Sequence, residues 1–221
     1  MAESITLADQ QGPEPSDSKA LRIVEGATKV FWKFGIRSVT MDDVARHLGI
    51  SKKTLYQYVT DKSDLVTKVL NNTSDRFCRE IDRIRANGYN AIEEMLAIAS
   101  YISKQVSAFH PSIYFDLAKY YPEACRIMDT NKQVLVVEQI AENMRRGVRE
   151  GLYRADVNVP LIAKLYVVRF DNAMTMEMGR ATDLSLAEMN WELFRYHIRG
   201  IASDKGLKYL EKKVTKERIE P

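Results

Sequence analysis

The feature that most constrains this fold is the spacing of apolar residues, which recur every three or four positions. Near the N-terminus, Leu21, Val24, Ala27, Phe31 and Phe34 follow this spacing. An α-helix has 3.6 residues per turn, so these five side chains should share one buried face. The periodicity continues toward the C-terminus without a convincing run of alternating apolar and polar residues. The sequence therefore predicts an all-α fold.

Capping residues and glycines divide this pattern into separate helices. Ser18 and Gly35 predict the limits of the first helix, because serine caps helix starts and glycine ends helices. The second helix begins after Thr40, which has capping-box spacing with Asp43, and it ends at Gly49. Further helices are predicted over about 51–58, 62–86, 159–178 and 186–202.

The second and third of these helices form a helix-turn-helix pattern, in which two short helices are joined by a turn containing glycine. Ala45 is small enough for the helices to approach closely, and Gly49 permits the tight turn. Ile50 and Leu55 are expected to anchor the pair against the first helix. The outward face then carries side chains able to reach phosphates or base edges, namely Lys52, Lys53, Tyr56 and Gln57.

Positive charge is concentrated around this motif. Between Lys19 and Asp64 there are nine basic and five acidic residues, whereas the whole chain has a net charge of only +3. The remainder of the chain is therefore close to neutral. A local basic field of this kind is typical of a nucleic-acid-binding surface, and a merely solvated face is the alternative.

The segment from about Lys19 to Leu65 resembles the DNA-binding domain of the TetR (tetracycline repressor) family and covers about a fifth of the chain. The family usually has alanine-glycine where this chain has Leu48-Gly49, and histidine-phenylalanine where it has Tyr58-Val59. The residues that carry the resemblance are Phe31, Phe34-Gly35, Val39-Thr40, Val44-Ala45, Leu48-Gly49-Ile50-Ser51, Leu55-Tyr56 and Lys62-Ser63-Asp64-Leu65.

The resemblance implies individual roles in DNA binding. Thr40 would hold a phosphate at a helix N-terminus, Tyr56 would bind another through its hydroxyl, and Gln57 is a candidate for reading adenine. Lys52 and Lys53 would face the major groove. The complete set of expected DNA contacts is Thr40, Met41, Ser51, Lys52, Lys53, Thr54, Tyr56, Gln57, Tyr58 and Lys62.

Residues 101–121 are rich in aromatic side chains, which commonly line ligand pockets but also occupy ordinary cores. Arg169 lies in apolar surroundings, where it could hold an acidic group of a ligand, pair with Asp171 or Glu177, or lie at a subunit interface. The residues expected to bind a small molecule are Ile98, Tyr101, Ile102, Phe109, Tyr114, Phe115, Tyr166, Arg169 and Phe170.

The helices predicted over about 159–178 and 186–202 are too apolar to face water on all sides. The family resemblance implies that two such helices from each subunit form a four-helix dimer interface. The residues expected at this homodimer interface are Ile162, Phe170, Met174, Met189, Leu193, Phe194, His197 and Ile201. The domain organisation predicted from the sequence is a disordered tail (1–17), a helix-turn-helix domain (18–64), a helical ligand-binding and dimerisation domain (65–205), and a charged tail or short helix (206–221).

Other classes of protein lack support in the sequence. Cys78 and Cys125 are far apart and outside any metal-ligand spacing, which favours reduced thiols in a cytoplasmic protein. No apolar run approaches the roughly 18 residues of a membrane helix. We find no glycine-rich phosphate loop and no nucleophile with a base, so neither a cofactor nor a metal nor catalysis is expected.

The sequence therefore predicts a DNA-binding transcriptional regulator, and the family resemblance implies a repressor that a small-molecule effector releases from a palindromic DNA operator. The alternative is an effector-independent DNA-binding regulator whose second domain only dimerises or binds a protein partner. An apolar cavity with a few polar groups would favour the first hypothesis, and a filled core would favour the second.

Overall fold

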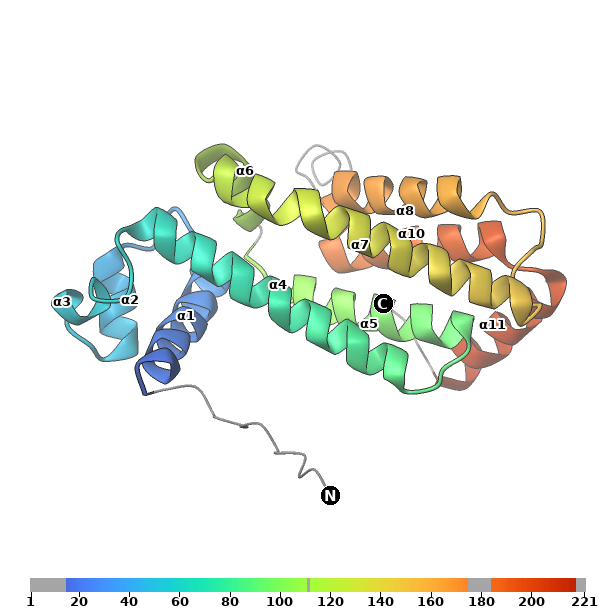
Figure 1. The fold of residues 1–221 in the computed structure, drawn as a ribbon, viewed down its shortest axis with the longest axis horizontal. Coiled ribbons are helices and arrows are strands. Elements are labelled where there is room, and N and C mark those ends of the chain that lie inside the picture. Colours follow the sequence, from blue (N-terminus) through green and yellow to red (C-terminus); the bar gives the residue numbers. More distant parts are fainter. Residues whose placement is uncertain (1–14, 111, 175–183, 218–221) are drawn as a thin grey trace, which may run out of the picture.

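The computed structural model describes residues 15–110, 112–174 and 184–217. Within these ranges the regular elements are all helices, apart from one isolated bridge between Tyr153 and Ala202, which confirms the all-α prediction. Figure 1 shows a small N-terminal unit at one end of an elongated helical bundle. That unit consists of α1 (Pro15–Phe34), α2 (Met41–Leu48) and α3 (Lys52–Leu55).

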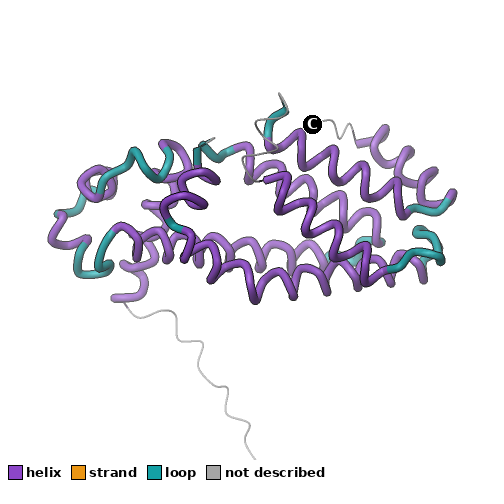
Figure 2. The backbone as a smooth tube through the Cα atoms, turned by 90° about the horizontal axis from the view of Figure 1, so that it is seen from above, coloured by secondary structure: helices purple, strands orange, loops and turns teal. Residues whose placement is uncertain are grey.

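The long helix α4 (Lys62–Ala86) leaves the N-terminal unit and runs along one side of the bundle. Helix α10 packs against both α5 and α8, and α7 packs against α4, α5 and α8. Figure 2 shows these helices lying lengthwise beside one another. No described helix has an apolar stretch long enough to cross a membrane. The remaining helices are α5 (Ala91–Ser107), α6 (Ile113–Tyr120), α7 (Pro122–Arg149), α8 (Val159–Met174), α10 (Leu186–Ile201) and α11 (Asp204–Glu217).

Local capping signals predicted the limits of α2, whereas α3 ends at Leu55 and not near residue 58 as predicted. Thr40 Oγ1 accepts a hydrogen bond from the Asp43 N–H at 3.2 Å, and the Asp43 carboxylate accepts one from the Thr40 N–H at 2.9 Å. This is the capping box expected at the start of α2. Helix α1 begins earlier than predicted, at Pro15 instead of after Ser18, because proline is well suited to the first turn of a helix.

The buried face of α1 differs from the prediction. Leu21 and Phe34 are 43% and 50% exposed, so they lie outside the face that α1 packs against α2 and α4. The residues of α1 that form the core are Ile23, Val24, Ala27, Val30 and Phe31.

The described part of the chain has two apolar cores. One fills the bundle, and the other lies among α1 to α4 in the N-terminal unit. The N-terminal core continues along α4 to Leu70 and also includes Ile113 and Leu117 of α6. The core of this unit therefore extends beyond the sequence boundary expected at residue 64.

Candidate nucleic-acid interface

The turn between α2 and α3 is held by backbone geometry and by a cap. Gly49 adopts the left-handed conformation with φ +65°, which favours glycine, and its N–H donates to the last carbonyls of α2. Ser51 caps α3 by accepting a hydrogen bond from the Thr54 N–H at 3.0 Å. Leu55 is fully buried and anchors α3 in the N-terminal core. These contacts fix which face of α3 points outward.

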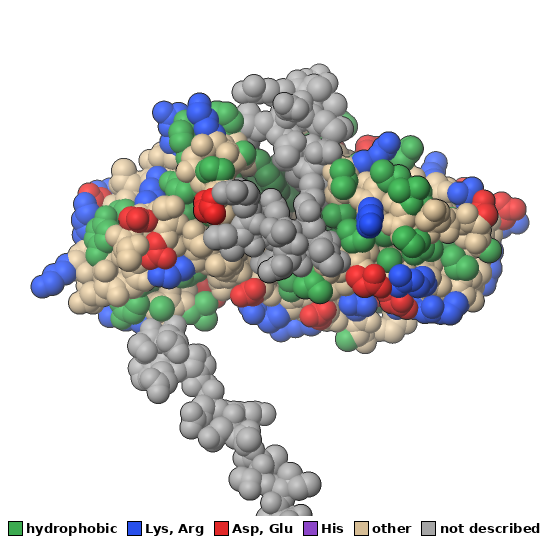
Figure 3. Space-filling model, turned by 45° about the horizontal axis from the view of Figure 1, so that its top comes forward, with side chains coloured by type: hydrophobic (Ala, Val, Ile, Leu, Met, Phe, Trp, Pro, Cys, Tyr) green, Lys and Arg blue, Asp and Glu red, His purple; other side chains and the backbone are tan. Residues whose placement is uncertain are grey.

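The outward face of this region carries the polar side chains that the sequence predicted. Lys52, Lys53 and Gln57 are exposed, and Tyr56 is exposed for 43% of its surface. Figure 3 shows Lys and Arg side chains projecting from the end of the molecule that carries α2 and α3. The structure therefore brings the expected groove-facing residues together on one convex end.

Thr40 and Ser51 lie at the exposed N-termini of α2 and α3. The Thr40 hydroxyl also donates to the Asp43 carboxylate at 2.6 Å, and these hydrogen bonds with Thr40 lower the pKa of Asp43. The first-turn N–H groups of α2 give this end a partial positive charge, which can hold a phosphate. Both threonine and serine are thus placed where a backbone phosphate could approach.

Met41 is a correction to the predicted set. Its side chain is 8% exposed and belongs to the N-terminal core. Methionine is apolar, so the first turn of α2 buries it instead of presenting it to solvent. Only the backbone N–H of Met41, at the start of the helix, remains available for a phosphate.

Two other predicted residues, Thr54 and Tyr58, are half-buried. The hydroxyl of Thr54 lies 2.8 Å from that of Ser51, so it supports the cap of α3. The Tyr58 ring lies beneath the ammonium of Lys19, at 5.9 Å from the ring centre. Both side chains therefore have structural contacts in addition to any contact with DNA.

An ion pair between Lys52 of α3 and Asp42 of α2 was not predicted from the sequence. The Lys52 ammonium lies 3.0 Å from the Asp42 carboxylate, and the hydrogen bond with Asp42 raises the pKa of Lys52. The two residues are ten positions apart, on different helices, so helical spacing gave no sign of the pair. Lys53 is the neighbouring exposed lysine on the same helix.

Lys62, also predicted to contact DNA, is turned toward the protein. Its ammonium donates to the Arg37 carbonyl oxygen at 3.3 Å, and burial lowers its pKa. This contact joins the start of α4 to the turn between α1 and α2. Lys62 is thus engaged with the protein backbone as well as half-exposed to solvent.

The residues expected to bind a ligand separate into different places. Ile98, Tyr101 and Ile102 share one half-buried face of α5, and the Tyr101 ring lies 5.6 Å from that of Phe77 on α4. Burial raises the pKa of the Tyr101 hydroxyl. These three residues remain together as one apolar face with a phenol.

The aromatic residues after α5 do not join that face. Phe109 packs against Trp32 of α1 with ring centres 5.0 Å apart, and Tyr114 lies 6.3 Å from Phe109. Phe115 makes an edge contact with Tyr120. The chain leaves α5 at Ser107, and α6 has different neighbours, so sequence proximity was a poor guide here.

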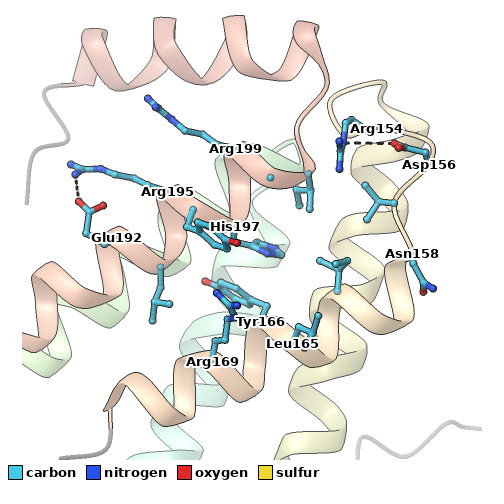
Figure 4. Close-up of a pocket in the computed structure, with 16 residues that line it drawn as sticks. Arg154, Asp156, Asn158, Leu165, Tyr166, Arg169, Glu192, Arg195, His197 and Arg199 are labelled. Atoms are coloured by element: carbon cyan, nitrogen blue, oxygen red, sulfur yellow. Dashed lines mark hydrogen bonds and ion pairs between the residues drawn. The ribbon is translucent and has the colours of Figure 1, made fainter. Parts of the chain in front are cut away.

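A groove of about 1080 Å³ lies between α8 and α10 (Figure 4). In Figure 4, Tyr166 of α8 and His197 of α10 point toward each other, and their ring centres are 4.0 Å apart. The Arg169 guanidinium stacks over the Tyr196 ring at 5.3 Å. The side chains of Phe170, Met174, Asp171 and Glu177 lie outside the described residues. Tyr196 is therefore the described partner of Arg169.

Four of the residues expected at a dimer interface have almost no surface left for a partner. Phe194, for example, is 2% exposed, because α10 packs against α5 and α8 within one protomer. They are corrections to the interface prediction: Met189, Phe194, His197 and Ile201. By contrast, Ile162 and Leu193 are half-buried and line the groove.

A different row of apolar side chains is exposed on these two helices. Leu161, Leu165 and Val168 of α8 are 51%, 45% and 54% exposed, and Tyr196 of α10 is 67% exposed. The three α8 residues follow helical spacing, which could have identified them. The interface prediction instead chose residues on the more apolar face of these helices, and that face forms the protomer's own core.

Among the residues that the structure describes, no group of three or more His, Cys, Asp and Glu side chains is placed to hold a metal ion.

Comparison with known proteins gives one family. Residues 23–69 match the family model described as "Bacterial regulatory proteins, tetR family". Over 81 residues the chain is 33% identical to an HTH-type transcriptional regulator of Staphylococcus aureus (strain USA300). The match covers 37% of this chain and 44% of that relative, so the chain spans less than half the length of the curated relative.

Two solved structures share the fold. A TetR-family transcriptional regulator from Agrobacterium tumefaciens has a TM-score of 0.67 at 18% identity, covering 85% of this chain and 99% of that one. A gamma-butyrolactone receptor has a TM-score of 0.61 at 17% identity, covering 90% of this chain and 96% of that one. At these identities the likeness is one of fold.

Proposed function

We propose that the chain is a member of the tetR family of bacterial regulatory proteins, whose model its residues 23–69 match, and that it binds a specific palindromic DNA sequence as a homodimer and represses transcription there. In this proposal a small-molecule effector bound in the helical domain releases the DNA. The protein acts in the cytoplasm, where bacterial DNA lies, and it is a regulator without catalytic activity.

The observation that carries the DNA-binding proposal is the outward face of α3 and of the turn that follows it. Lys52, Lys53, Tyr56 and Gln57 are exposed together, and the buried Leu55 holds α3 in place. Lysine and tyrosine side chains suit phosphates, and glutamine can pair with both acceptor and donor of adenine. A helix held this way can enter the major groove without further ordering.

The exposed apolar row supports the proposal of a homodimer. Leu161, Leu165, Val168 and Tyr196 lie on the two helices that border the groove. A contiguous apolar surface on a soluble protein commonly marks an interface. A second copy bound by its own α8 and α10 would cover this row and the groove around a two-fold axis.

The long helix α4 supports the proposal of effector control. It begins beside the helix-turn-helix and continues past Phe77, whose ring contacts Tyr101 on the half-buried face of α5. A ligand at that face would touch the helix that carries the DNA-binding unit. The gamma-butyrolactone receptor, named for a small molecule, has the same fold. We expect an effector with an apolar body and one hydrogen-bonding group.

Selection of duplexes from a random-sequence library tests the DNA-binding proposal. The full chain should enrich one palindromic sequence and bind it as a dimer with half-sites about one helical turn apart. Lys53→Ala should lower its affinity, whereas Lys208→Ala, at an exposed lysine on α11, should leave it unchanged. Enrichment of no sequence would exclude the proposed function.

A further inference from the structure

The N-terminal core is completed by α6, a helix from the middle of the sequence. Ile113 and Leu117 of α6 are buried among side chains of α1 and α4, and Phe109 and Tyr121 pack against the same core. The DNA-binding unit is therefore formed by two separate segments of the chain.

Asp116 provides the polar part of this contact. It is 3% exposed, and its Oδ2 accepts hydrogen bonds from the Arg37 N–H at 2.9 Å and from the Ser112 hydroxyl at 3.2 Å. Burial of a carboxylate is costly unless hydrogen bonds compensate for lost water. The two donors compensate here, so the carboxylate and the Arg37 N–H hold each other in a fixed relative position.

Two further hydrogen bonds hold the end of α1 and the turn between α1 and α2. The Arg37 carbonyl accepts from the Lys62 ammonium at 3.3 Å, and the His110 N–H donates to the Trp32 carbonyl at 2.7 Å. Gly35 has φ +83°, and a Cβ at this position would lie 2.6 Å from the Ser112 hydroxyl oxygen. Residue 35 must therefore be glycine for α6 to approach the chain this closely.

This turn leads directly to the start of α2. Val39 is buried, and the next residue, Thr40, is the N-cap of the helix. Any shift of Arg37 relative to α6 therefore moves the helix end at which a phosphate contact is proposed.

We propose that Asp116 is a positioning residue for DNA binding, which holds the turn over residues 35–39 against α6 and thereby fixes the N-terminus of α2. The inference rests on the proposed DNA-binding function. It adds to that function a residue of the helical domain, 76 positions away from Thr40 in sequence, that touches no DNA. The proposed DNA-reading unit then consists of residues 15–70 together with α6, its neighbours Phe109 and Tyr121, and Ala124 of α7.

The test compares Asp116→Ala with Asp116→Asn in the full chain. The DNA is the duplex that the unaltered chain selects from a random library. Asp116→Ala should weaken binding about tenfold, as expected for loss of a hydrogen bond to a charged group. Asp116→Asn keeps a side-chain oxygen that can accept from the Arg37 N–H, and it should restore most of the affinity. The control is Asp82→Ala, at an exposed aspartate of α4, which should bind like the unaltered chain.

Hydrogen exchange of the same variants without DNA gives an independent measurement. The Arg37 amide should exchange faster in Asp116→Ala, while the amides of α8 and α10 keep their protection. Ser112→Ala is a milder variant that removes one donor and keeps the carboxylate, and it serves if Asp116→Ala does not fold. Among these variants, a faster exchange of the Arg37 amide should go with a lower affinity for the selected duplex. A folded variant with faster Arg37 exchange and unchanged affinity would overturn the proposal.

The two proposals fail in different ways. If the unaltered chain selects no duplex, the DNA-binding function fails, and the exchange rate of Arg37 still reports whether Asp116 holds the turn. If the unaltered chain binds a selected duplex and Asp116→Ala binds it equally well, only the positioning role is lost.

Discussion

The ammonium of Lys52 and the carboxylate of Asp42 lie 3.0 Å apart across the turn between α2 and α3. Both side chains are more than half exposed, so the pair contributes little to folding stability. In the proposed complex with DNA, a phosphate that approaches Lys52 would compete with the Asp42 carboxylate for it.

Asp42→Asn should therefore raise affinity for DNA of any sequence and steepen its dependence on salt. Freeing one cation per motif adds counterions that are released on binding, and the slope of log affinity against log salt should steepen by about one per motif. Fluorescence anisotropy over a salt series measures both quantities, with Asp75→Asn, at an exposed residue of α4, as the control. An unchanged slope would mean that Lys52 does not contact a phosphate.

Tyr56→Phe tests the proposed phosphate contact of the tyrosine hydroxyl. Removing the hydroxyl should weaken binding of all duplexes by a similar factor, roughly tenfold, because a phosphate contact carries no base information. The measurement is the ratio of affinities for the selected duplex and a scrambled one. A changed ratio would indicate that Tyr56 reads bases.

Leu165→Glu tests the homodimer. Placing a carboxylate in an apolar interface should dissociate the dimer and weaken DNA binding, since one motif alone makes half of the contact. Leu135→Glu on α7 changes another exposed leucine and should leave the dimer intact. Sedimentation velocity measures the assembly state. Dissociation of both variants, or of neither, would contradict the proposed interface.

His197 should make folding stability depend on pH. Burial lowers its pKa to about 4, whereas the unfolded chain has an ordinary histidine near 6.5. Between these values the unfolded state binds more protons, so the free energy of unfolding falls as the pH drops from about 6.5 to 4. The loss amounts to up to about 3 kcal/mol.

Denaturant unfolding at pH 7 and pH 4.5, at one protein concentration, checks this dependence. His197→Gln should lose less stability over that interval than the unaltered chain, whatever its absolute stability. His47→Gln, at an exposed residue of α2, should keep the full dependence. Equal losses in the His197→Gln variant and the unaltered chain would show that another group is responsible.

Features fixed by neighbouring residues could be predicted from the sequence. The capping box of Thr40 with Asp43 forms as predicted, because it needs only residues three positions apart. The exposed face of α3 follows from the same local geometry once Leu55 is assigned to the core.

Features fixed by packing between helices could not be predicted in this way. Phe194 of α10 is buried and Leu161 of α8 is exposed, although both are apolar, and only the packing of these helices against their neighbours decides the difference. Phe109 likewise packs against Trp32, which lies far away in the sequence. The pair of Asp42 with Lys52 depends on the crossing of two helices, which periodicity does not describe.

The burial of Ile113 and Leu117 in the N-terminal core has a consequence for protein engineering. A hybrid regulator made by grafting residues 15–64 onto a different helical scaffold would leave that core without its α6 side chains. The graft would also separate the Arg37 N–H from the Asp116 carboxylate. A graft of the helix-turn-helix unit that keeps this core would therefore include α6, or would substitute the recipient's matching helix to fit Trp32, Gly35 and Arg37.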